Sequence, residues 1–104
     1  MTDIRKLHRE LVARVRDSDA TTTRELRRAV FDNAGMSEPM RTLIEKVALN
    51  SEDVTDEDVA AVRSAGLTED QIFEIMVCAA VGQADRQYNG ALAALAEATK
   101  DGVR

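Results

Sequence analysis

The chain contains one cysteine, Cys78, and one histidine, His8, and a thiol with an imidazole beside it can act as nucleophile and base. Cys78 lies in the middle of a long helical pattern, far from a helix N-terminus that would lower its pKa, and Glu74 and Asp85 are expected on its side of that helix. These carboxylates disfavour the thiolate. Nothing local places His8 beside Cys78, and a lone histidine on a basic helix is usually a surface residue. The sequence therefore favours a structural thiol over a catalytic one.

Carboxylates offer a second kind of chemistry. Glu45, Glu52 or Asp58 could act as general acid or base, with Arg86 holding an anionic substrate. This role requires a pKa moved toward neutrality by burial or by a neighbouring charge, which the sequence alone does not establish. For Arg86 the structural alternative is an ion pair with Asp85, with Glu74 or with a carboxylate of a second subunit.

Two further groups of polar residues could form a site. The acidic run SEDVTDED, residues 51–58, could bind a hard cation, but it lacks the glycine and closing glutamate of an EF-hand, and helix capping already explains Thr55 and Asp58. We expect no metal and no cofactor. Gln83 and Gln87 are one helical turn apart within an apolar arc, where an unpaired amide costs about 1–3 kcal/mol. They either bond other helices or symmetry mates, or line a polar pocket.

The elements that must position these residues are helices. Apolar residues recur at helical spacing and no strand pattern is present, so we predict an all-α domain of about five helices in orthogonal or antiparallel packing. The first expected helix runs from a cap at Asp3 to about Asp17, and the second runs from a Thr22–Glu25 capping box to Asn33 and Gly35. The third begins at a cap at Ser37, has Pro39 in its first turn and ends at the polar stretch after Leu49. The fourth runs from Thr55 and Asp58 to Gly66, and the fifth from Thr68 with Gln71 to about Lys100, with a possible kink at Gly82 or Gly90.

Composition limits the class of protein. The 104 residues are enough for one domain, 1–104, with a basic helical pair over 1–35 and a core over 37–100. A net charge of −5 disfavours nucleic acid, and no apolar run suits a membrane span or a signal peptide, so a cytoplasmic protein is expected. Arginines concentrate in the first two helices. They form either a solvated face or a surface that pairs with the acidic residues 52–58 of another subunit.

The last helix is apolar around most of its circumference, which is typical of a helix that is central in its domain or shared with another subunit. A domain of this size has few helices to surround it, so we predict a homo-oligomer. Cys78 is expected on the opposite, acidic stripe. The apolar arc is centred on Met76, Ala80, Ala84 and Ala91 and flanked by Ile72, Phe73, Val77 and Tyr88.

About sixty residues resemble the carboxymuconolactone decarboxylase and alkyl hydroperoxidase D-like superfamily. The matching pieces are RTLIEKVA from Arg41, VTDEDVAAVRSAGLTEDQIFE from Val54, and the pattern AA(x)5R that ends at Arg86. The resemblance implies a helical oligomer whose long alanine-rich helix follows an Ala-Gly-Leu turn. Its fixed points are mostly packing and capping residues, so it indicates the fold more than the activity.

Peroxidatic members of that superfamily carry a Cys-x-x-Cys-x-x-x-His motif, and the corresponding positions here are approximately Ser51, Val54 and Asp58. None matches, and reduction of a peroxide through that motif needs a second thiol. The resemblance therefore implies a noncatalytic oligomer that functions in binding or assembly, with a small molecule as a possible ligand. Two alternatives are a cofactor-independent decarboxylase or lactone-type enzyme that uses carboxylates and Arg86, and a single-cysteine redox protein that uses Cys78.

Overall fold

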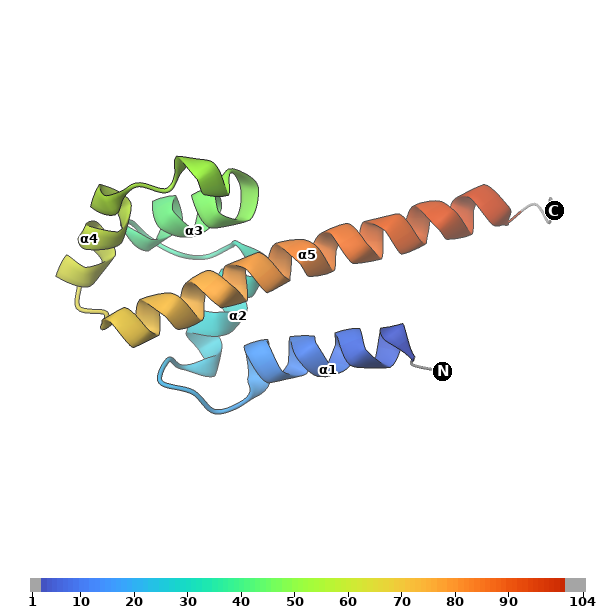
Figure 1. Ribbon diagram of the computed structural model, residues 1–104, viewed down its shortest axis with the longest axis horizontal. Helices are drawn as coiled ribbons and strands as arrows, with labels where there is room; N and C mark the ends of the chain where they lie inside the picture. The colour runs from blue at the N-terminus through green and yellow to red at the C-terminus, as the bar shows by residue number, and fades with distance from the viewer. Residues whose placement is uncertain (1–2, 101–104) are drawn as a thin grey trace.

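The computed structural model describes residues 3–100, and these residues are all helical, with no strand among them (Figure 1). The all-α class and the number of five α-helices predicted from the sequence are confirmed. The elements are α1 (Ile4–Asp17), α2 (Arg24–Asp32), α3 (Met40–Leu49), the 3₁₀ helix η1 (Ser51–Asp53), α4 (Asp56–Ser64) and α5 (Glu69–Thr99).

The long helix α5 is the element against which the other four α-helices pack. In Figure 1, α1 lies along one side of α5 and runs in the opposite direction, while α3 and α4 lie on the other side and α2 crosses between them. The C-terminal end of α5 projects beyond this group of helices, and the chain measures 56 × 28 × 23 Å. Within residues 3–100, none of the helices combines the length and the hydropathy needed to cross a bilayer.

The core lies around α5, where α2 and α3 make most of the contacts with it. Gly82 of α5 faces the backbone of α2 so closely that a Cβ atom there would lie 2.1 Å from the carbonyl oxygen of Phe31. The helix continues through Gly82 and Gly90 without interruption. The buried core consists of Val12, Val30, Phe31, Leu43, Ile44, Val62, Ile72, Ile75, Cys78 and Ala79.

Two helices begin with the reciprocal capping boxes that the sequence predicts. Thr55 accepts a hydrogen bond from the backbone of Asp58, whose carboxylate accepts one from the Thr55 backbone, and Thr68 and Gln71 do the same for α5. The predicted cap of α1 at Asp3 is also confirmed. These caps satisfy backbone N–H groups that the helix itself leaves without partners.

Two predicted caps are wrong. The second helix is capped by Thr23 and not by Thr22, because the Thr22 hydroxyl is bound to Glu74 of α5. Ser37 does not cap the third helix with its side chain. The first turn of α3 is held instead by Glu38, whose carboxylate accepts hydrogen bonds from the backbone and the hydroxyl of Thr42.

The predicted ends of α2 and α4 are correct. Asn33 closes α2 in the left-handed conformation with φ of 50°, and Gly66 follows α4 with φ of 113°, a region that L side chains rarely adopt. Both residues let the chain reverse direction within a few positions.

Candidate functional site

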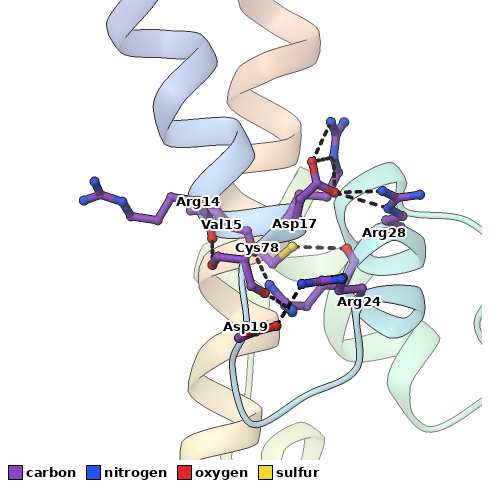
Figure 2. Close-up of polar contacts among 10 residues, drawn as sticks. Arg14, Val15, Asp17, Asp19, Arg24, Arg28 and Cys78 are labelled. Atoms are coloured by element: carbon purple, nitrogen blue, oxygen red, sulfur yellow. Dashed lines mark hydrogen bonds and ion pairs between the residues drawn. The ribbon is translucent and has the colours of Figure 1, made fainter.

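Cys78 lies in the core between α5 and α2, and not on an acidic stripe as expected from the sequence. Its side chain is fully buried, and its Sγ–H donates to the backbone carbonyl of Arg27 at 3.1 Å (Figure 2). Burial raises the pKa of the thiol to about 11, although the nearby Arg27 guanidinium acts in the opposite direction. The thiol is therefore protonated at neutral pH and out of reach of a substrate in solution.

The carbonyl that accepts the hydrogen bond from Cys78 belongs to Arg27, whose side chain also has a structural role. Arg27 is 2% exposed, and its guanidinium donates to the carbonyl oxygens of Val15 and Ser18 at the C-terminal end of α1. A cation at this position complements the partial negative charge of a helix C-terminus. Ion pairs between Asp17 and Arg28 and between Asp19 and Arg24 surround this junction (Figure 2). The region around the thiol thus joins α1, α2 and α5.

The candidate acid and base residues are not assembled into a site with Arg86. Asp58 accepts hydrogen bonds from Lys46 Nζ at 2.8 Å and from the Thr55 backbone at 2.9 Å, and these bonds hold its pKa below the ordinary value. A pKa moved in this direction is the opposite of what a general acid at neutral pH requires. Glu45 is exposed at the edge of a shallow hollow of about 300 Å³ that it shares with Lys46.

Arg86 holds two elements together. Its guanidinium donates to the carbonyl oxygen of Phe31 at 2.5 Å, one of the last carbonyls of α2, and to Gln83 Oε1 at 2.9 Å. Gln83 is thus bonded within its own helix, while Gln87 is exposed. Arg86 therefore binds a backbone carbonyl and an amide where the sequence suggested a carboxylate partner such as Asp85.

Glu74, which the sequence placed on the Cys78 side of the helix, holds the loop after α1 in place. Glu74 of α5 accepts hydrogen bonds from the backbone N–H groups and the hydroxyls of both Thr21 and Thr22. Desolvation acts to raise the Glu74 pKa, but these four hydrogen bonds outweigh it and lower the pKa. The run TTT from Thr21 to Thr23 was the available signal, since it holds more hydroxyls than one helix cap needs.

A groove between α1 and α5 contains His8. His8 Nε2 lies 2.7 Å from Asp85 Oδ1, and the imidazole stacks on the ring of Tyr88 with centroids 4.2 Å apart. Asn89 donates to the other Asp85 oxygen at 3.3 Å. The groove has a volume of about 510 Å³ and is lined by Arg5, His8, Arg9, Val12, Ala13, Arg16, Asp85, Tyr88, Asn89 and Leu92.

On the other side of α1 and α5 lies an exposed apolar face. Most large apolar side chains that the described chain exposes belong to these two helices, and Phe73 is the most exposed of them at 69%. At 100° per residue, this stripe of α5 points away from the core positions Ile75 and Gly82, and no charged residue interrupts it from Phe73 to Leu95. The apolar face comprises Ile4, Leu7 and Leu11 of α1 and Phe73, Val77, Ala80, Ala84, Ala91 and Leu95 of α5.

Comparison with known proteins identifies no relative: no family model, curated protein or solved structure matches the chain. Among residues 3–100, no group of three or more His, Cys, Asp or Glu side chains is placed to hold a metal ion. The arguments about function therefore rest on the groove, the apolar face and the buried thiol themselves.

Proposed function

We propose that the protein is a homo-oligomeric helical module of the carboxymuconolactone decarboxylase and alkyl hydroperoxidase D-like kind, which functions in binding or assembly and not in catalysis. The observation that carries this proposal is the exposed apolar face of α1 and α5. Water-exposed Phe, Leu and Ile side chains gathered on one face of a protein mark an interaction surface.

The shape of the apolar face favours a second copy of the chain as its occupant. Alanines at positions 80, 84 and 91 lie along α5 between Phe73 and Val77 on one side and Leu95 on the other, so another helix can approach closely at the alanines and pack against the larger side chains at both ends. The C-terminal end of α5 projects from the domain (Figure 1), and Leu95 near this end is 61% exposed. The same uncharged surface on two copies is self-complementary about a two-fold axis, which is the commonest symmetry of homo-oligomers.

The noncatalytic part of the proposal is supported by the surroundings of the candidate residues. Cys78 has a raised pKa and no access to solvent, Asp58 has a lowered pKa and two hydrogen-bonded partners, and Arg86 is occupied by a carbonyl. Each of these residues has a stabilising role that explains its presence without a substrate.

Analytical ultracentrifugation of the purified chain tests the proposal. The wild-type chain is expected to sediment as a dimer or larger oligomer. Phe73→Glu should weaken self-association by roughly 30-fold or more, because an unpaired carboxylate would be buried in the interface. Phe73 is 69% exposed, so the change leaves the core of one chain intact.

The matched control is Ala60→Glu, which adds the same charge at an exposed position of α4, outside the apolar face. This variant should associate as the wild type does. A wild-type chain that remains monomeric at high concentration, or an equal loss of association in both variants, would contradict the proposal.

A further inference from the structure

The groove between α1 and α5 lies on the side of these helices away from the apolar face, and its charge is opposite in sign to that of the chain. The net charge of the chain is −5, yet the α1 wall of the groove presents Arg5, Arg9 and Arg16 at helical spacing. Arg16 is neutralised by Asp17, to which it donates through Nη2 at 3.1 Å. Arg5 and Arg9 form no ion pair with any residue between 3 and 100.

The one carboxylate inside the groove is already satisfied by other donors. Asp85 Oδ1 is hydrogen-bonded to His8 Nε2 at 2.7 Å, and Asp85 Oδ2 accepts a hydrogen bond from the Asn89 side-chain amide at 3.3 Å. Both oxygens are therefore engaged by groups that are not arginine. Within residues 3–100, the guanidinium groups of Arg5 and Arg9 have no anionic partner, and each presents a planar fork of donors that fits a carboxylate or a phosphate.

The rest of the lining is apolar or aromatic. Val12 is buried at the floor, and Ala13 and Leu92 add aliphatic surface, while the Tyr88 ring is fixed by stacking on His8 at 4.2 Å. The volume of about 510 Å³ is within the range of small-molecule sites. An inorganic ion alone would leave most of this surface uncovered.

We infer that the groove is a binding site for a small organic anion that carries a carboxylate or phosphate at one end and a flat apolar body at the other. Arg5 and Arg9 bind the anionic group, and the apolar body lies against Val12 and Leu92 beside the Tyr88 ring. The His8–Asp85 pair keeps α1 and α5 at the separation that the groove requires. The site lies within one chain, so it does not depend on self-association.

Phenyl phosphate, benzoate, inorganic phosphate and benzyl alcohol are suitable probes, with binding followed by amide chemical shifts in nuclear magnetic resonance spectra. Phenyl phosphate or benzoate should bind saturably with a dissociation constant of about 1 mM or below. The shifts should concentrate at Ala13, Asn89 and Leu92. Inorganic phosphate and benzyl alcohol, which each carry only half of the recognised chemistry, should bind at least tenfold more weakly.

The double variant Arg5→Gln/Arg9→Gln should raise the dissociation constant at least tenfold. Its matched control is Lys6→Gln/Arg14→Gln, which removes the same charge from exposed positions of the same helix but outside the groove, and should change it less than twofold. Saturable binding lost only in the groove variant supports the inference. It is overturned by absence of saturable binding, by equal weakening in both double variants, or by inorganic phosphate binding as tightly as phenyl phosphate.

Measuring the same titrations on Phe73→Glu separates this inference from the proposed oligomer. Phe73 lies on the apolar face and does not line the groove. The groove should bind the probes equally well in this variant. Loss of binding in Phe73→Glu with its fold intact would show that the site needs a second copy, and would overturn the assignment to a single chain.

Discussion

Replacing Gly82 by alanine tests the packing that positions both faces of α5. In an isolated helix this change is favourable by about 1 kcal/mol, because glycine has the greater backbone freedom to lose. Here the added Cβ would lie 2.1 Å from the carbonyl oxygen and 2.8 Å from the carbonyl carbon of Phe31. Both atoms belong to the backbone of α2, which cannot move aside as a flexible side chain would.

The expected loss of free energy of unfolding follows from the contacts that α2 loses if its backbone shifts away from α5. Overpacking of this kind costs about 1–3 kcal/mol, and the hydrogen bond from Arg86 to the Phe31 carbonyl, with its charged donor, is worth a further 1.5–3 kcal/mol or so if it is lost. Against a helix-propensity gain of about 1 kcal/mol, and with that hydrogen bond lost, we expect Gly82→Ala to lower the free energy of unfolding by about 1.5–5 kcal/mol. This is a large share of the stability of a domain of this size.

Gly90→Ala is the matched control on the same helix. A Cβ at Gly90 meets no atom within 4 Å, so only the propensity gain of about 1 kcal/mol remains. Urea unfolding of the three chains, followed by far-ultraviolet circular dichroism, gives the two free-energy differences. A stabilised or unchanged Gly82→Ala variant would refute the close contact between α2 and α5.

Two further predictions concern the thiol and the loop after α1. Cys78 should resist alkylation by iodoacetamide in the folded chain and react readily in urea, because its pKa is raised to about 11 and its side chain is fully buried. Rapid labelling of the folded chain would contradict this prediction. Thiol-dependent peroxide reduction that Cys78→Ser abolishes would also contradict it. Glu74→Gln should lower the free energy of unfolding at pH 7 by about 1–3 kcal/mol, because the amide NH₂ would face donors from Thr21 or Thr22. Since hydrogen bonding lowers the Glu74 pKa in the folded state despite desolvation, its contribution is present above the ordinary carboxyl pKa and disappears as the pH falls through the lowered value. Unfolding measured from pH 7 to pH 3 should show the difference between the two chains shrinking, and a constant difference would contradict the assignment.

Helix class and most helix ends were predictable because their signals are local. The capping boxes at Thr55 and Thr68 each need only a hydroxyl and a polar partner three residues later, and both form as expected. The same rule could not predict which of Thr21, Thr22 and Thr23 caps α2. Each hydroxyl could cap α2, and the choice of Thr23 goes together with the binding of Thr21 and Thr22 by Glu74, about fifty residues away.

The buried face of α5 could not be predicted from periodicity. A helix that is apolar around most of its circumference has no single direction that its pattern prefers, and the sequence analysis centred the apolar arc on Ala80 and Ala84 and not on Ile75 and Cys78. The structure places the latter pair inside. The close approach of α2 at Gly82 accompanies this choice, and it depends on a contact between segments far apart in the sequence.

The His8–Asp85 pair shows the same limit for the candidate site. The two residues are separated by 77 positions, so no local spacing in the sequence could predict that His8 contacts Asp85. The arginines of α1 were noted as either a solvated face or a surface for another subunit. Their placement along the groove gives two of them, Arg5 and Arg9, a third use that only the antiparallel packing of α1 on α5 creates.

The three sides of α5 therefore have different tasks. One side packs against α2 and α3, and its residue Gly82 lets the backbone of α2 approach closely. A second side carries Asp85 and Asn89 and closes the groove with α1. The third is uncharged and exposed from Phe73 onward. Because α1 separates the second side from the third, a ligand in the groove and a second chain on the apolar face can be bound together without competing for the same surface.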